Sequence, residues 1–135
     1  MKGIADTGFL VAFANRNDKH HAWAVSLAET IETPLLTCEA VLAEAAFHLR
    51  SVQVVTAMLR DGLVKLAFHM DEHEDGLNGL AARYADQNPD LADLCLVRMS
   101  ELFAKYTVVT VDASDFRVYR RNKRDVIPFA CPPNL

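Results

Sequence analysis

Cysteine is scarce in this chain, and the three cysteines that are present are widely separated. Cys38, Cys95 and Cys131 are odd in number and include no C-x-x-C pair. This pattern argues against a disulfide framework and against a zinc site built from paired thiolates. We therefore expect the three thiols to be buried and reduced.

Long hydrophobic runs and an excess of positive charge are also lacking. Asp6 lies where a signal peptide requires apolar residues, and no apolar stretch approaches the ~20 residues of a membrane span. We expect a cytoplasmic protein with no membrane partner. The formal net charge of -4 excludes the overall positive field that drives indiscriminate nucleic-acid binding, so a polyanionic substrate would have to be held locally.

The chain does contain enough apolar sequence for one core of ordinary size. Its 135 residues are 51% hydrophobic and 24% charged, with no internal repeat and no low-complexity segment. We expect residues 1–135 to form a single domain.

Apolar patterning predicts strands that alternate with helices. The predicted strands are 3–5, 35–37, 63–69 and 107–111, with a last edge strand around 126–131. The predicted helices are 9–14, 20–31, 38–50, 51–60, 71–87 and 91–104. Residues 112–115 are predicted to form a loop that leads into a basic segment. This alternation predicts an α/β fold with a parallel sheet covered on both faces.

Two acids directly follow predicted strands. Asp6 follows the strand at 3–5, and Asp112 follows the strand at 107–111. Because ligands bind at the carboxyl ends of strands in open α/β sheets, both acids are candidate site residues. Each could instead be an N-cap whose side chain accepts a backbone N–H.

Two further acids belong to helices that are poorly suited to charge. Glu44 is flanked by alanines and other apolar residues, and a buried, unpaired glutamate is costly. Its alternative is a solvated stripe shared with His48 and Ser51. Asp93 lies at the start of a helix that is apolar nearly all round and therefore buried. Its alternative is a capping arrangement in which Asp90 is the N-cap.

Convergence of these acids would create a charge problem. Two carboxylates about 4 Å apart repel by about 4 kcal/mol at the effective dielectric of protein sites. Either one carboxylate takes up a proton, or a hard divalent cation supplies the compensating charge. All-oxygen ligand sets favour Mg²⁺ or Mn²⁺ over zinc.

Four segments, taken in order, resemble the motif series of the PIN domain. They are I-A-D-T-G-F-L-V-A at 4–12, the helix that carries Glu44, L-A-D-L-C-L-V-R-M at 91–99 and T-V-D-A-S-D-F at 110–116. Their order and spacing match as well, over essentially the full chain. The resemblance is closest to the small bacterial and archaeal ribonucleases typified by VapC toxins of toxin–antitoxin pairs.

The resemblance implies a PIN-like three-layer α/β/α sandwich with a central, mainly parallel sheet. It also implies an endoribonuclease in which acids at the strand ends bind one or two Mg²⁺ or Mn²⁺ ions. Carried over to this chain, the acids that serve as metal ligands and catalytic residues are Asp6, Glu44, Asp93 and Asp112. Such cations offset charge in the hydrolysis of a phosphodiester and activate water. A homodimer and a neutralising antitoxin protein are further implications.

Three more residues are secondary candidates for the same site. Thr7 resembles the hydroxyl residue that the family carries after the first acid, and it could orient water or a carboxylate. Asp115 competes with Asp112 as the fourth acid, and Asp90 stands in the same relation to Asp93. For Asp115 and Asp90 we favour helix or turn capping. Leu94 departs from the small residue that often follows the third acid, which matters little if its side chain points into the core.

A basic cluster follows the last acid. It could hold RNA phosphates beside the acidic pocket, or it could be a solvated turn near an edge strand. Its members are Arg117, Arg120, Arg121, Lys123 and Arg124.

Three rival functions fit the sequence less well than a PIN-like ribonuclease. A phospho-receiver domain requires paired acids near the first strand and a late Lys before a Pro, whereas this chain has a single Asp6 there and Ile127 before Pro128. A haloacid-dehalogenase-type phosphatase requires a second acid two residues after the first, which Gly8 is not. A catalytically inactive PIN-like module that binds RNA or protein stays open, although the presence of all four acids disfavours it.

Overall fold

The centre of the fold is a five-stranded parallel sheet. The structure is a computed structural model, and it describes all 135 residues. The strand order is β3-β2-β1-β4-β7. The strands are β1 (Lys2–Ala5), β2 (Glu32–Thr37), β3 (Val64–Leu66), β4 (Thr107–Val109) and β7 (Phe129–Ala130), and each neighbouring pair is parallel. A separate antiparallel hairpin pairs β5 (Arg120–Arg121) with β6 (Asp125–Val126).

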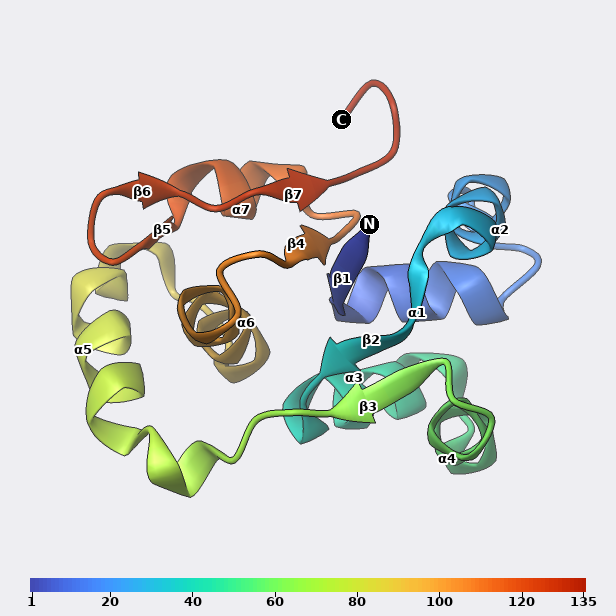
Figure 1. Cartoon of the computed structure of the whole chain (residues 1–135), viewed down its shortest axis with the longest axis horizontal. Coiled ribbons are helices and arrows are strands. Elements are labelled where there is room, and N and C mark those ends of the chain that lie inside the picture. Colours follow the sequence, from blue (N-terminus) through green and yellow to red (C-terminus); the bar gives the residue numbers. More distant parts are fainter.

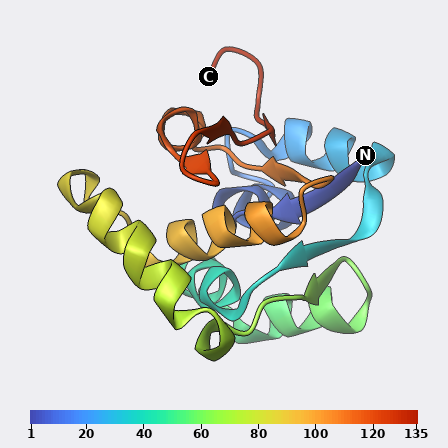
Figure 2. The same ribbon diagram turned by 60° about the vertical axis from the view of Figure 1, so that its left-hand side comes forward.

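Helices cover both faces of this sheet, which gives the predicted three-layer α/β/α arrangement. They are α1 (Thr7–Ala14), α2 (His21–Thr30), α3 (Glu39–Leu49), α4 (Val52–Arg60), α5 (Glu74–Arg83), α6 (Leu91–Leu102) and α7 (Ala113–Val118). In Figure 1, α1 and α2 lie on one side of the sheet, and α5 and α6 lie on the other. The turned view of Figure 2 shows α6 running alongside β1, and α6 packs against both β1 and β4.

The core is centred on these elements. In α6 every residue from Ala92 to Val97 is buried, as an apolar pattern all round the helix predicts. Ile4 of β1 and Val108 of β4 are fully buried between the helical layers. Leu94 is also buried, so its side chain does point into the core.

The strand order places the ends of β1 and β4 at a change of direction in the chain. From β1 the chain moves outward to β2 and β3, and it then crosses back to lay β4 against the other side of β1. Ala5 pairs with Val109 in register. In open α/β sheets the crevice at such a switch point is where ligands bind, so the residues that follow β1 and β4 are well placed for a site.

Two predicted helices have different bounds in the structure. The helix α1 begins at Thr7 rather than Phe9, because the Asp6 carboxylate caps its first N–H group. The predicted helix at 71–87 is divided into α5 and two flanking 3₁₀ turns, Met70–Glu72 and Ala85–Gln87, because His73 and Tyr84 have non-helical backbones.

The end of the chain also differs from its prediction. Residues 113–115 open the helix α7 instead of forming a loop. The basic segment forms the β5–β6 hairpin, whose turn places Asn122 and Lys123 in the left-handed region at φ 52° and 72°. The predicted last strand is present at the sheet edge as β7, but it is only two residues long.

All three cysteines are free thiols. Cys38 and Cys95 are buried, as predicted, whereas Cys131 is only half-buried. No helix of the chain is both long enough and apolar enough to cross a membrane.

Candidate active site

A cavity of about 420 Å³ opens at the carboxyl ends of β1 and β4, and it is strongly acidic. No Lys or Arg is among the residues that line it. The four acids from distant parts of the sequence therefore do converge on one place. Its acidic lining residues are Asp6, Asp18, Glu44, Asp90, Asp93 and Asp112.

Asp6 lines this cavity and is buried, and both of its carboxylate oxygens accept a hydrogen bond. Its backbone N–H continues the β1–β4 pairing by donating to the Val109 carbonyl at 3.0 Å. Its Oδ1 accepts the Thr7 N–H at 2.7 Å, and its Oδ2 accepts the Thr110 hydroxyl at 2.6 Å. The capping and site interpretations of Asp6 are thus compatible, since the N-cap oxygen belongs to a residue that also lines the cavity.

Glu44 reaches the cavity from the second turn of α3. It is half-buried, and its Oε1 accepts the Thr7 hydroxyl at 2.8 Å. The Thr7 side chain therefore orients this carboxylate. The helix is more exposed than its apolar sequence suggests, because Ala43 and Phe47 are exposed. His48, one turn further along α3, also lines the cavity.

Asp90 and Asp93 are joined at the start of α6. The Asp90 carboxylate is the N-cap and accepts the Asp93 N–H at 2.8 Å. Asp93 is 8% exposed, and its Oδ2 accepts the hydroxyl of Tyr119 at 3.0 Å. Asp90 therefore has its predicted capping role, and it adds negative charge to the cavity as well.

Asp112 occupies the N-cap position of α7, so the preference for Asp115 as the capping residue was wrong. The Asp112 N–H donates to the Thr110 hydroxyl oxygen at 2.8 Å. Asp115 lies in the first turn of α7, and its carboxyl hydrogen-bonds with that of Asp112. Of these two acids, only Asp112 lines the cavity.

Burial, together with the negative charge gathered at the cavity, raises the pKa values of two of its carboxyl groups. Burial, followed by the nearby charges of Asp90 and Asp6, raises the pKa of Asp93 to about 8. Burial is also the main reason that the pKa of Asp6 is raised to about 6, with Asp112 and Asp90 adding repulsion. The hydrogen bond with Asp112 raises the pKa of Asp115 to about 6. Near neutral pH Asp93 therefore tends to keep its proton unless positive charge is supplied, and Asp6 and Asp115 ionise less readily than an ordinary aspartate.

The donor set fits a hard divalent cation in its chemistry. It consists of carboxylate oxygens with two nearby threonine hydroxyls, the type of ligand that Mg²⁺ and Mn²⁺ prefer. In this conformation no three acidic, histidine or cysteine side chains are close enough together to hold one ion. Mg²⁺ keeps several waters and commonly uses only one or two direct carboxylates, for which the cavity has room.

The family model of the PIN domain matches residues 4–122, which is most of the chain. The chain belongs to the PIN domain family. The match includes the end of β1, all of β4 and all of the acids that line the cavity. A search of curated proteins finds no significant match.

A solved structure has a similar fold. The crystal structure of Mycobacterium tuberculosis VapC20, a Sarcin–Ricin loop cleaving toxin, aligns with a TM-score of 0.68 at 17% sequence identity. The alignment covers 79% of this chain and 87% of that chain. At this identity the likeness concerns the fold, and it agrees with the parallel sheet and two helical layers of this PIN domain.

The basic cluster of the PIN domain lies outside the acidic cavity. Arg120 donates through Nη1 to backbone carbonyls of 117–119, and Arg121 donates to the carbonyls of Ser100 and Ala104 at the end of α6. Arg117 hydrogen-bonds to the carbonyl of Leu135. Lys123 and Arg124 are exposed on the hairpin turn. The guanidinium groups of the three arginines with backbone partners thus also stabilise the C-terminal part of the fold.

Three residues of the site were missed by sequence reasoning. Asp18 was not among the candidate acids, yet it lines the cavity. Thr110 and Tyr119 are buried donors to Asp6 and Asp93. The one available signal was the position of Thr110 two residues before a candidate acid; nothing local marked the other two.

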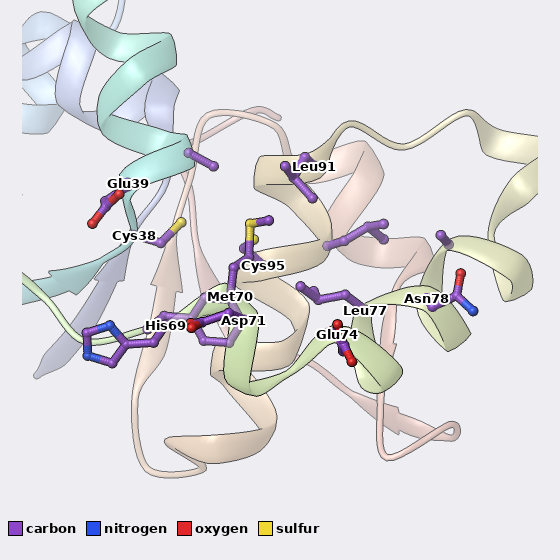
Figure 3. Close-up of a pocket in the computed structure, with 14 residues that line it drawn as sticks. Cys38, Glu39, His69, Met70, Asp71, Glu74, Leu77, Asn78, Leu91 and Cys95 are labelled. Atoms are coloured by element: carbon purple, nitrogen blue, oxygen red, sulfur yellow. The ribbon is translucent and has the colours of Figure 1, made fainter.

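Figure 3 shows a second cavity of about 700 Å³, which is larger than the acidic one. Most of its lining is hydrophobic, and it is bounded by the start of α3, the segment that leads into α5, and α6. Leu94 and Cys95 face this cavity, whereas Asp93 faces the acidic one. The first turn of α6 therefore separates the two.

Proposed function

We propose that this PIN domain is a Mg²⁺- or Mn²⁺-dependent endoribonuclease that hydrolyses RNA phosphodiester bonds. The observation that carries the proposal is the convergence of Asp6, Glu44, Asp93 and Asp112 on one cavity at the switch point of the sheet. The raised pKa values of Asp6 and Asp93 support it, because a fold gains no stability from such a cluster.

The four acids have distinct roles in this proposal. We assign Asp6 and Asp93 to direct metal ligation, and Glu44 and Asp112 to ligation either directly or through an intervening water. A divalent cation in this cavity would offset charge on the phosphodiester and activate water. The chain itself needs to supply only oriented carboxylates, held by Thr7, Thr110 and Tyr119, and no covalent nucleophile.

RNA as the substrate class is supported by the solved neighbour VapC20, which is a Sarcin–Ricin loop cleaving toxin. We extend this to a VapBC-type toxin that acts as a homodimer in the cytoplasm and is neutralised by an antitoxin protein. The exposed side chains of the basic cluster, which include Lys123 and Arg124, are assigned to RNA phosphates.

The test is RNA cleavage by the purified chain. We expect cleavage with Mg²⁺ or Mn²⁺, none in EDTA, and a loss of at least about 100-fold in rate for Asp6→Asn and for Asp93→Asn. Asp86→Asn is the matched control, because Asp86 is exposed and lies outside the cavity. Circular dichroism should show that each variant is folded.

Full activity in EDTA, or wild-type rates in both cavity variants, would contradict the proposal. A wild-type chain that binds RNA and a divalent cation but cleaves no RNA would instead identify an inactive PIN-like binding module.

A further inference from the structure

Two tyrosines in edge-to-face contact lie between the acidic cavity and the basic hairpin. Tyr84 directly follows α5, and Tyr119 directly follows α7. Both are buried, and their rings meet edge to face with centroids 5.1 Å apart. Phe116 packs edge to face on Tyr119 as well, at 5.5 Å. The Tyr119 ring is therefore fixed by neighbours from two directions.

The two hydroxyl groups have different partners. Tyr119 donates its hydroxyl to Oδ2 of Asp93 at 3.0 Å. The hydroxyl oxygen of Tyr84 accepts the backbone N–H of Arg120 at 2.8 Å. One tyrosine thus contacts a carboxylate of the cavity, while the other contacts only the start of the hairpin.

The Asp93 carboxylate needs such a contact to have one orientation. The terminal torsion of an aspartate side chain is broad, so its two oxygens are poorly ordered without a partner. The N-cap bond from Asp90 fixes only the backbone of Asp93. The fixed hydroxyl of Tyr119 engages Oδ2 and leaves the other oxygen for an ion.

We propose that Tyr119 is a positioning residue that holds the Asp93 carboxylate in the orientation that binds a divalent cation. The inference rests on the proposed metal-dependent function. Hydrogen-bond donors behind a ligating carboxylate commonly contribute about 10- to 100-fold to metal affinity. Tyr119 itself contacts neither the ion nor RNA.

The experiment compares Mn²⁺ binding by the wild-type chain, Tyr119→Phe, Tyr84→Phe and Asp93→Asn, with free Mn²⁺ measured by electron paramagnetic resonance. Tyr119→Phe keeps the packed ring and removes one hydroxyl, and we expect about 10-fold weaker binding. Tyr84→Phe removes the hydroxyl of the tyrosine that packs edge to face on Tyr119, and it should leave Mn²⁺ affinity unchanged. Asp93→Asn should lose binding at this site.

A second readout separates positioning from a general loss of structure. If Tyr119 positions a ligand, the Mn²⁺ concentration for half-maximal RNA cleavage rises in Tyr119→Phe, and the maximal rate returns at saturating Mn²⁺. A merely structural defect would lower the maximal rate and would not be overcome by metal. Mg²⁺ binding to the wild-type chain should also perturb the near-ultraviolet absorbance of tyrosine, and this signal should survive in Tyr84→Phe.

The outcomes distinguish this inference from the proposed function. If the wild-type chain binds no Mn²⁺, the metal-dependent function fails before any variant is compared. If the wild-type chain binds Mn²⁺ and Asp93→Asn does not, but Tyr119→Phe binds as the wild type does, the positioning role alone is overturned. Absence of the tyrosine signal in the wild-type chain also overturns it, without reliance on a variant.

Discussion

Thr110 connects two of the acids through a single hydroxyl group. It is fully buried, donates to Asp6 and accepts the backbone N–H of Asp112. The donated bond lowers the pKa of Asp6 and so opposes part of the effect of burial. One side chain therefore stabilises a charge at the end of β1 and the backbone turn that presents the fourth acid.

Removal of this hydroxyl should affect both stability and metal binding. We expect Thr110→Val, which keeps the side-chain shape, to lose about 1–3 kcal/mol of unfolding free energy, because it leaves buried polar groups without a partner. We also expect about 10-fold weaker Mn²⁺ binding. Urea denaturation and Mn²⁺ titration are the measurements.

Thr110→Ser is the matched control for this prediction. It keeps the hydroxyl and loses one methyl group, so its Mn²⁺ affinity should stay near that of the wild type. Equal Mn²⁺ affinity in the valine and serine variants would show that the hydroxyl has no part in the site.

At this scale the sequence predicted those site residues that have a local signal. Asp6 and Asp112 follow strands, and Asp93 begins an apolar helix, so position along the chain identified them. Thr110 and Tyr119 act across 104 and 26 residues of sequence, and their partners are set by the β1–β4 pairing and by the path of α7. Such contacts depend on tertiary structure, which no local pattern encodes.

At the scale of elements, Gly8 allows α1 to approach the segment that follows β4. A Cβ atom at Gly8 would collide with the side chain of Val111, which lies on the wall of the acidic cavity. The first turn of α1 and the end of β4 can therefore come together only if this helical position has no side chain. This close approach brings Thr7 and Asp112 to the same cavity.

We predict that Gly8→Ala is destabilising, although alanine is normally the better helix former by about 1 kcal/mol. The collision with Val111 should cost about 1–3 kcal/mol, measured by urea denaturation. Gly79→Ala on α5 is the control, because a Cβ there meets nothing within 4 Å and should stabilise the chain. Recovery of stability in the double variant Gly8→Ala/Val111→Ala would show that the loss comes from the contact between these two side chains. An unfolding free energy for Gly8→Ala at or above that of the wild type would refute the close approach.

Elements with strong apolar periodicity were predicted well, and polar ones were not. The helix α6 and the strands β1 and β4 lie close to their expected positions, because burial on all sides leaves a clear pattern. The segment 71–87 is polar, so its pattern could not reveal the breaks at His73 and Tyr84. One break coincides with stacking of the His73 ring on Phe68, a contact made outside the helix.

At the scale of the whole molecule, the acidic cavity lowers stability as pH rises. The folded-state pKa values of Asp93 and Asp6, about 8 and about 6, lie above the ordinary value of 3.8. A raised carboxyl pKa means that the folded state binds more protons than the unfolded state, so stability falls as pH increases from about 4 through these values. A divalent cation bound in the cavity would reverse this loss.

We therefore predict that Asp93→Asn melts at least about 3 °C above the wild-type chain at pH 9 in EDTA. The difference should shrink toward pH 4, where Asp93 is protonated in the folded state and increasingly so in the unfolded state. Mn²⁺ should raise the melting temperature of the wild-type chain and have much less effect on the variant. Differential scanning fluorimetry across the pH range measures all three effects. A melting temperature of Asp93→Asn below that of the wild type at pH 9 would contradict this account. The control variant Asp86→Asn should melt as the wild type does at every pH.

The order of strands in the sheet has a consequence for the chain during its synthesis. The wall of the cavity formed by β4 comes from residues near 110, whereas Asp6 leaves the ribosome first. A nascent polypeptide that has not yet been extended past Asp112 has neither the hydrogen bond from Thr110 to Asp6 nor the fourth acid in place. If the folded chain cuts RNA, it would therefore acquire that capacity only after the segment that follows β4 has been synthesised and paired with β1.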